Sequence, residues 1–308
     1  MLNSFMVVGT QVLILFILIG LGVLGTKCRL ITKEGVSTMT EIMLYLVTPC
    51  VMINAFQKDF DYSMFIGFLI ACGSAVFAHV LAILLGKLFF KGQTADRKSV
   101  MRFAVIFSNC GFMSLPLLEA LLGSDGVFYG ASYVAVFNIM CWSYGLKIMD
   151  PECGKLSIKK ILLNPGIDGV VIGLIFFFTS FHLPELILKP VQYMAALNTP
   201  VPMLIIGYYA AQLDVRSMLR DKDEYLVLLL RLVVTPLIVF GVLYALGIRG
   251  SLLVACVLSC SAPVAATGTM FSVKFGQDAK LSAELVALST FISIITMTLI
   301  VGMVQYLA

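Results

Sequence analysis

The chain has 308 residues, of which 60% are hydrophobic and only 12% are charged, a balance that excludes an ordinary soluble domain of this length. Its net charge of +4 does not indicate a nucleic-acid partner, because the basic residues lie between apolar runs or at their ends. Its eight cysteines are scattered without the spacing of metal ligands, so we expect neither a metal nor a cofactor.

The first apolar run, residues 6–26, has no basic segment before it and no clear cleavage site of small residues. We interpret it as a retained membrane span and not as a signal peptide. Further runs follow, each long enough to cross a bilayer as a helix. We predict ten spans, over residues 6–26, 36–56, 64–89, 99–122, 126–149, 166–182, 186–211, 225–246, 250–273 and 282–306. The predicted fold class is therefore an all-α integral membrane protein with short loops.

The lysines and arginines set the predicted orientation, because cytoplasmic loops carry an excess of both. Seventeen basic residues lie in or beside the loops after spans 1, 3, 5, 7 and 9: Lys27, Arg29, Lys33, Lys87, Lys91, Arg97, Lys98, Arg102, Lys147, Lys155, Lys159, Lys160, Arg216, Arg220, Lys222, Lys274 and Lys280. Only Lys58, Lys189 and Arg249 lie beside the other loops. This bias predicts a multi-pass protein of the cell membrane, inner or plasma, with both termini outside the cytoplasm.

The two halves of the sequence resemble each other weakly. The stretch "YLVTPCVMI" at 45–53 in span 2 resembles "ALNTPVPMLI" at 196–205 in span 7, and "GSD" at 123–125 resembles "GQD" at 276–278. We therefore predict two five-helix repeats, residues 1–149 and 150–308. Because five is an odd number, the second repeat enters the membrane inverted relative to the first.

Spans 4 and 9 correspond in this repeat, and both are interrupted, by "SNCGFMSLPLL" at 108–118 and by "SCSAPVAATG" at 259–268. A proline removes one backbone donor and clashes with the preceding turn, and in lipid the freed groups need partners inside protein or at a wet cavity. Simple kinks at Pro116 and Pro263 are one interpretation. We favour two broken helices that cross near the midplane and direct positive half-helix N-termini at an anion, as in secondary transporters.

The candidate substrate-binding residues lie at the two breaks, together with one asparagine of span 5. They are Ser108, Asn109, Cys110, Gly111, Pro116, Ser261, Ala262, Pro263, Val264 and Asn138. Asn109 is the strongest candidate, because an asparagine in mid-membrane must find hydrogen-bond partners; its alternative role is to cap a half-helix. Each serine has the alternative of bonding to its own helix, and Asn138 that of joining two helices.

Two ionisable residues inside spans, His79 and Glu119, are candidates for proton coupling, since such side chains face protein or water. Arg231 lies near the cytoplasmic end of span 8, from where its side chain can extend to the surface. Asp168, the only aspartate inside a span, lies in its first turn, so no carboxylate cage for sodium is evident. A sodium site made of carbonyls and hydroxyls at the breaks stays open.

These motifs resemble those of the auxin efflux carriers and their bacterial relatives, within the bile, arsenite and riboflavin transporter superfamily. Asn109 and Pro116 fall on the family's fourth-span asparagine and proline, and Ala262–Pro263 on part of its second crossing motif. "NPGIDGVVIGLI" at 164–175 resembles the family's Asn-Pro segment. Ser108 departs from the pattern, where the family has proline, and so does Val264, where it has glutamine.

The resemblance implies ten helices in two inverted repeats, with a scaffold of spans 1, 2, 6 and 7 and a transport domain of spans 3–5 and 8–10. It also implies small organic anions as substrates, among them malate, malonate and auxin-like acids. The departures at Ser108 and Val264 argue against auxin itself. The resemblance further suggests a homodimer formed through the scaffold.

Our sequence-based hypothesis is a secondary active transporter of carboxylates that works by alternating access, with an elevator-type motion. Coupling to H⁺ or Na⁺ is open, and a sodium-coupled anion symporter is one form of the same hypothesis. A channel-like or sensory membrane protein is the alternative. An enzyme is not expected, because the chain has only two histidines and no evident nucleophile–base pair or ligand cluster.

Overall fold

The computed structural model describes residues 2–150, 165–212 and 221–307, and the regular elements in these ranges are helical. The first half contains α1 (Leu2–Lys27), α2 (Lys33–Ile42), η1 (Met43–Val47), α3 (Thr48–Ala55), α4 (Tyr62–Phe89), α5 (Ala95–Ile106), η2 (Cys110–Ser114), α6 (Leu115–Met140), η3 (Cys141–Gly145) and α7 (Leu146–Met149). The all-α class is confirmed.

The second half contains α9 (Pro165–Thr179), α10 (Glu185–Ala196), α11 (Pro200–Ala210), α13 (Lys222–Leu229), η4 (Leu230–Val234), α14 (Thr235–Ala245), α15 (Gly250–Ser261), α16 (Thr267–Lys274) and α17 (Ala279–Leu307). Six helices of the described ranges are long and apolar enough to cross a membrane, and two shorter apolar helices, Gly166–Thr179 and Gly250–Ser261, add to them. The count of ten spans and their inverted arrangement stay predictions. Lys155, Lys159, Lys160, Asn164, Arg216 and Arg220, used in the sequence analysis, lie outside the described residues.

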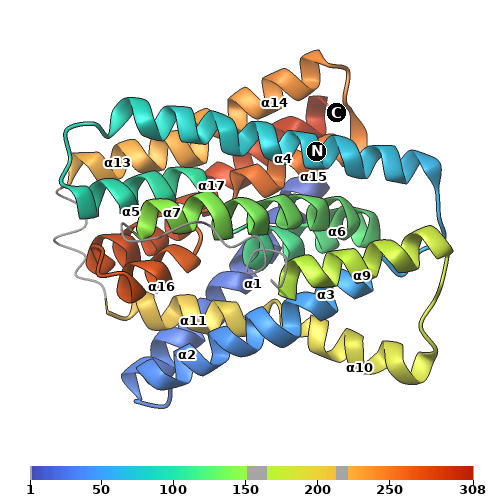
Figure 1. Cartoon of the computed structure of the whole chain (residues 1–308), viewed down its shortest axis with the longest axis horizontal. Helices are drawn as coiled ribbons and strands as arrows, with labels where there is room; N and C mark the ends of the chain where they lie inside the picture. The colour runs from blue at the N-terminus through green and yellow to red at the C-terminus, as the bar shows by residue number, and fades with distance from the viewer. Residues whose placement is uncertain (1, 151–164, 213–220, 308) are drawn as a thin grey trace.

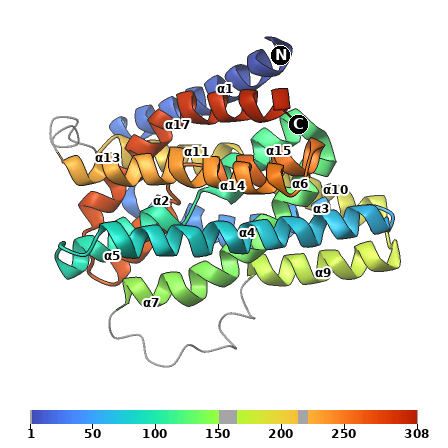
Figure 2. The same ribbon diagram turned by 90° about the horizontal axis from the view of Figure 1, so that it is seen from above.

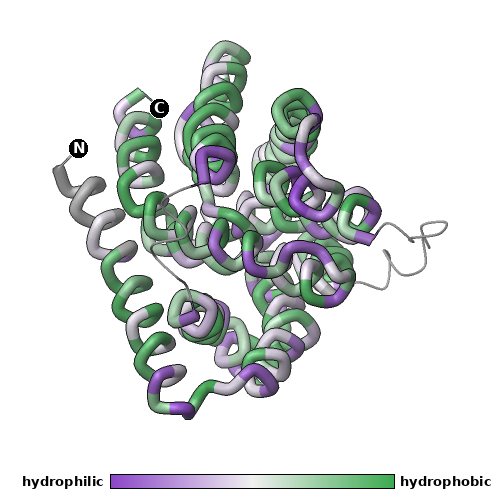
Figure 3. Tube along the Cα trace, turned by 90° about the vertical axis from the view of Figure 1, so that its left-hand side faces the viewer, coloured by the Kyte–Doolittle hydropathy of each residue, from purple (hydrophilic) through white to green (hydrophobic). Residues whose placement is uncertain are grey.

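The helices lie side by side in a bundle (Figure 1), and hydrophobic residues cover most of their length. Figure 3 shows α1 as mostly apolar until hydrophilic residues appear where the chain turns into α2. In Figure 2 α1 runs beside α17, so the start of α1 and the end of α17 lie at the same end of the molecule, and the two helices are in contact. Apolar helices of this length suit a bilayer, because their backbone groups are satisfied within each helix.

Two helix pairs join the halves of the chain: α1 packs against α11, and α3 packs against α9. The first contact is backbone to backbone, since a Cβ on Gly207 would collide with the Ile19 carbonyl oxygen and lie 2.7 Å from the Gly22 Cα atom. Glycine is therefore required there by close approach and not by a turn. Both pairs also border the interrupted span 4, because α6 contacts α1, α3 and α9.

The π-helical segments η1, η2 and η4 each end two residues before a proline, at Pro49, Pro116 and Pro236. A proline ring inside an α-helix clashes with the carbonyl of the preceding turn, and a widened π-helical turn relieves this clash. At two of these sites a threonine compensates: the Thr48 hydroxyl donates to the Met43 carbonyl at 2.8 Å, and the Thr235 hydroxyl donates to the Leu230 carbonyl at 2.7 Å.

One predicted span is divided in the structure, and the connection between two others is a sharp bend. The predicted span over 186–211 is divided into α10 and α11 at residues 197–199, because Pro200 lacks the backbone N–H of a continuous helix and its ring clashes with the carbonyl four residues earlier. Spans 4 and 5 are joined by a sharp bend at Gly123, whose φ of 63° and ψ of −149° are open to glycine and strained for other residues.

Candidate binding site at the crossing of two interrupted helices

The breaks in spans 4 and 9 meet each other. Helix α5 ends at Ile106 and α15 ends at Ser261, and the extended segments that follow run antiparallel. The Asn109 amide donates to the Pro263 carbonyl at 2.7 Å, and the Ala265 amide donates to the Phe107 carbonyl at 3.0 Å. Backbone groups released by one broken helix thus find partners in the other, which is the arrangement that a membrane interior requires.

Serine side chains complete the hydrogen bonding of the crossing. The Ser108 hydroxyl donates to the Ser259 carbonyl at 3.1 Å, and the Ser114 hydroxyl donates to the Leu258 carbonyl at 3.3 Å. The Val264 amide donates to the Ser289 hydroxyl of α17 at 3.0 Å. The Ser261 hydroxyl donates within its own helix, to the Val257 carbonyl at 2.6 Å. The protons of Ser108 and Ser261 are therefore used by the protein backbone.

A small cavity of about 40 Å³ lies where the two broken helices restart. Its walls come from the start of η2, the start of α16, the last turns of α6, η3 and the span-2 helix: Leu44, Thr48, Ser108, Asn109, Gly111, Phe112, Val134, Phe137, Asn138, Cys141, Trp142, Ala265, Ala266 and Thr267. We call this cavity the inner pocket. The N-terminal ends of two half-helices therefore border one space, and such ends carry partial positive charge.

Within the described part of the chain, two amide groups of the inner pocket have no hydrogen-bond partner. The Nδ2 atoms of Asn109 and Asn138 are buried without an acceptor, and the two residues are only 4% and 8% exposed. Buried polar groups in proteins are nearly always paired, so two unpaired donors in one pocket point to an acceptor that is supplied from outside. A carboxylate only accepts hydrogen bonds and fits this requirement.

The other predicted residues lie around the inner pocket without lining it. Cys110, Ala262, Pro263 and Val264 are buried in the crossing itself. Residues of this pocket that the sequence analysis missed include Thr48, Trp142 and Thr267. Thr48 belongs to the Thr-Pro pair of the repeat, and Trp142 is the single tryptophan, one turn beyond Asn138 on the same helix face; these were the available signals.

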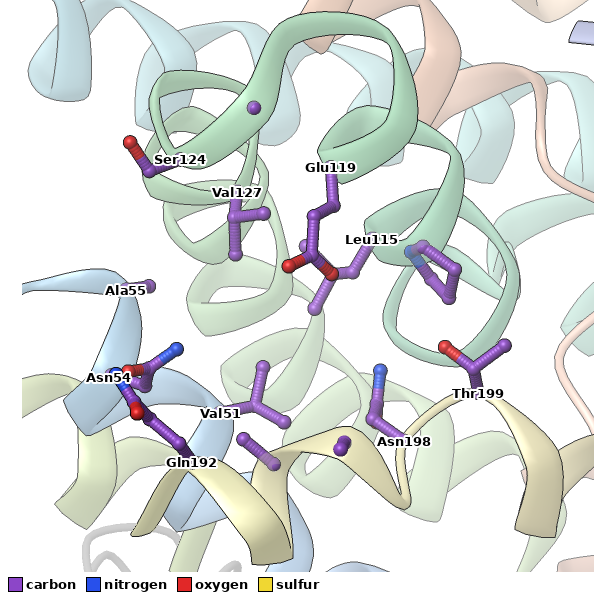
Figure 4. Close-up of a pocket in the computed structure, with 14 residues that line it drawn as sticks. Val51, Asn54, Ala55, Leu115, Glu119, Ser124, Val127, Gln192, Asn198 and Thr199 are labelled. Atoms are coloured by element: carbon purple, nitrogen blue, oxygen red, sulfur yellow. The ribbon is translucent and has the colours of Figure 1, made fainter. Parts of the chain in front are cut away.

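A larger cavity of about 530 Å³ lies beside the first half of α6, and we call it the outer pocket (Figure 4). Pro116 and Glu119 line it, and Figure 4 shows the Glu119 carboxylate directed toward the polar side chains of Asn54 and Gln192 across the space. None of its lining residues is basic. The Asn198 side chain lines it too, and its Nδ2 atom donates to the Gly111 carbonyl at 3.0 Å, between the two pockets.

The candidate coupling residue His79 lines neither pocket. Its Nδ1 atom donates to the Ala75 carbonyl at 2.7 Å, and its ring packs among the rings of Phe107, Tyr133 and Phe137. Within the described part of the chain, no group of three or more His, Cys, Asp and Glu side chains is placed to hold a metal ion.

Interrupted helices that cross beside a small pocket with a few polar groups, inside an apolar multi-span protein, define a membrane transporter as the class of protein. The model of the membrane transport protein family matches residues 7–160 and again residues 152–301. The chain therefore belongs to this family, which is that of the auxin efflux carriers, and is a multi-pass membrane transporter and not an enzyme. The resemblance derived from the sequence is confirmed.

Relatives in other organisms are similar over almost the whole chain. A protein of Methanothermobacter thermautotrophicus named "Uncharacterized transporter" is 24% identical over 294 residues, which are 94% of this chain and 93% of that protein. A second uncharacterized transporter, from Methanocaldococcus jannaschii, is 23% identical over 304 residues, which are 94% of this chain and 96% of that protein. A protein of Rhizobium meliloti named "Putative malonate transporter" is 23% identical over 302 residues, 93% and 92% of the two chains.

Proposed function

We propose that this transporter is a secondary carrier of small organic anions, which bind through a carboxylate in the inner pocket. The observation that carries the proposal is the pair of buried amides, Asn109 and Asn138, which have no acceptor within the described structure. They border the same space as two half-helix N-termini, where N–H groups and partial positive charge favour an anion. A short carboxylic acid such as malonate or malate is the proposed substrate, and the name of the Rhizobium meliloti relative supports it.

The size of the inner pocket supports a single carboxylate. One water-sized group occupies roughly 10–15 Å³ by this measure of volume, so a cavity of about 40 Å³ holds a few heavy atoms. A carboxylate has three. The remainder of the substrate is proposed to extend away from the amides, and the outer pocket serves as its vestibule.

The proposed mechanism is alternating access by movement of a transport domain, spans 3–5 and 8–10, against a scaffold of spans 1, 2, 6 and 7. Supporting this division, α1 packs against α11 and α3 against α9, which pairs the four proposed scaffold spans with one another. Polar contacts cross the proposed boundary from Asn198 to Gly111 and from Lys58 to Ser124 and Asp125. These contacts must break if the transport domain moves.

The ten-span inverted topology, the extracytoplasmic termini and the homodimer belong to the same proposal. The charge bias of the loops, the two successive family matches and the nearness of the start of α1 to the end of α17 support the topology and the orientation. The dimer rests on the family resemblance alone. Coupling to H⁺ through Glu119 or His79, or to Na⁺, completes the proposal. Glu119 has the better position, because it reaches the outer pocket.

The test is uptake of labelled malonate and malate into proteoliposomes, with and without imposed pH and sodium gradients. Wild type, Asn109→Ala and the matched control Asn54→Ala are compared, because Asn54 lies in the outer pocket. We expect saturable uptake with counterflow, its loss in Asn109→Ala and its retention in the control. Unsaturable flux without counterflow would indicate a channel, and unchanged affinity in Asn109→Ala would remove the inner pocket as the site.

A further inference from the structure

Arg231 is the largest side chain that is fully buried in the described structure, with 1% of its surface exposed. It lies in η4, and the sequence suggested that it reaches the cytoplasmic surface. It does not. Arg231 lies in the widened π-helical turn before Pro236. The Thr235 hydroxyl stabilises this turn by donating to the Leu230 carbonyl. The guanidinium is directed into the protein, toward the helix crossing.

The guanidinium binds the ends of both interrupted helices. Its Nη1 atom donates to the carbonyls of Val105, at 3.0 Å, and Ile106, at 3.4 Å, in the last turn of α5. Its Nη2 atom donates to the carbonyl of Cys260, in the last turn of α15. One side chain of span 8 thus joins the C-terminal ends of spans 4 and 9 where each is interrupted.

Among the described residues Arg231 has no ion pair with a carboxylate. A buried charge needs compensation. The C-terminal end of a helix carries about half a negative charge, so two such ends together balance about one guanidinium. The compensation of Arg231 therefore comes from the two helix ends that it binds.

The charge balance at Arg231 also affects the N-terminal ends of the helical segments that restart after each break. Without Arg231, the two negative C-terminal ends at the crossing offset the two positive N-terminal ends that restart the helices. With the C-terminal ends neutralised, the N-terminal ends at the inner pocket keep their positive potential. The inner pocket then matches a ligand group of about one negative charge.

We propose that Arg231 is a fixed positioning cation that clasps the C-terminal ends of both interrupted helices and thereby makes the inner pocket selective for anions. The selectivity half of this inference rests on the proposed carboxylate site, and the clasp half does not. Arg231 does not line the pocket, so it acts through the helices and through its field.

The test compares wild type, Arg231→Met and Arg231→Lys, purified in detergent, with two ligands of similar shape: malonate, which carries two charges, and its monomethyl ester, which carries one. Thermal unfolding without ligand reports on the clasp, and dissociation constants for both ligands report on the field. Arg249→Met is the matched control, because Arg249 lies on the Tyr244 ring at the end of span 8 opposite to Lys222.

We expect Arg231→Met to lower the unfolding temperature and to weaken the monoester on the order of tenfold, as loss of one nearby charge predicts. Malonate is expected to weaken by a clearly larger factor, because a field acts on each charge. Arg231→Lys keeps the charge but lacks the forked guanidinium that reaches both helices. We therefore expect this variant to unfold at a lower temperature than wild type. Its ratio of the two ligand affinities is expected to equal that of wild type. Arg231→Lys also serves if Arg231→Met does not fold.

Equal weakening of both ligands by Arg231→Met would overturn the field effect, since mere distortion of the site does not distinguish ligand charge. An altered ratio in Arg231→Lys would overturn it as well. An unchanged unfolding temperature in both variants would overturn the clasp. If wild type binds neither ligand, the proposed carboxylate site fails. A lowered unfolding temperature in both Arg231 variants would still support the clasp.

Discussion

The two pockets beside span 4 differ in size and in how their polar groups are satisfied. The outer pocket is about 530 Å³ and contains the Glu119 carboxylate, and the amide nitrogen of its Asn198 already donates to Gly111. The inner pocket is about 40 Å³, has no charged lining residue, and holds the unpaired amides of Asn109 and Asn138. The large volume of the outer pocket indicates a route of access. The buried hydrogen-bond donors without a partner in the inner pocket indicate where an acceptor is recognised.

The largest expected effect comes from the inner pocket. Asn138→Ala removes one proposed donor to the carboxylate, and a hydrogen bond to a charged group contributes about 1.5–3 kcal/mol. We expect the affinity for malonate to fall by about 10- to 150-fold, measured by competition with labelled substrate in proteoliposomes.

The matched control is Gln192→Ala, which removes an amide from the outer pocket. Its affinity for malonate is expected to stay at the wild-type value. If Gln192→Ala weakens binding as much as Asn138→Ala does, the distinction between a recognising pocket and a vestibule is lost.

An intermediate effect is expected at the frame of the crossing. Ser289→Ala removes the hydroxyl that accepts the buried Val264 amide proton, and a buried donor left unpaired costs about 1–3 kcal/mol. We expect a lower unfolding temperature in detergent, with a smaller change in substrate affinity than for Asn138→Ala.

Ser124→Ala is its control, because Ser124 is exposed at the outer pocket and its hydroxyl accepts from the Lys58 side chain, not from a buried backbone amide. This variant is expected to unfold at the wild-type temperature. Wild-type unfolding of Ser289→Ala would show that the crossing does not depend on this bond.

The smallest effect is expected at the rim of the outer pocket, where Lys58 forms an ion pair with Asp125. Asp125 is 59% exposed, and exposed ion pairs contribute roughly 0–1 kcal/mol that salt screens. We expect Lys58→Met to reduce the free energy of unfolding by no more than about 1 kcal/mol, and less at high salt.

Lys189→Met is compared with it, since Lys189 pairs with Glu185 within one helix, at 2.9 Å. The two variants are expected to be alike in unfolding. A much larger loss in Lys58→Met would mean that the outer rim ties span 2 to the segment between spans 4 and 5 more strongly than an exposed ion pair can.

Much of the fold follows from local patterns in the sequence. Long apolar runs predict helices that suit a bilayer, and Pro116 and Pro263 with their polar neighbours predict two interruptions; α5 and α15 do end before these prolines. The division of span 7 at Thr199 was missed, although Pro200 carries the signal, because a proline near the middle of an apolar run is consistent with a kink or a break.

The candidate site was predicted less completely than the helices. Asn109 and Asn138 were chosen as polar residues in spans, and the structure brings both to one pocket. Thr267 and Trp142 were missed, because neither has a pattern that distinguishes a pocket wall from ordinary packing. For Arg231 the sequence allowed an extension to the surface, since it gives the depth of the residue along the helix and not the direction of its side chain.

The sequence by itself determined that this protein is a helical membrane transporter with two interrupted spans, because hydropathy and proline geometry act over neighbouring residues. Only the tertiary structure decided which polar groups at the breaks are satisfied. The partner of the Ser108 hydroxyl lies 151 residues away, and that of the Arg231 guanidinium lies 126 residues away in one helix and 29 in another. Hydrogen bonds over such separations depend on how helices cross, and no local pattern of residues specifies that.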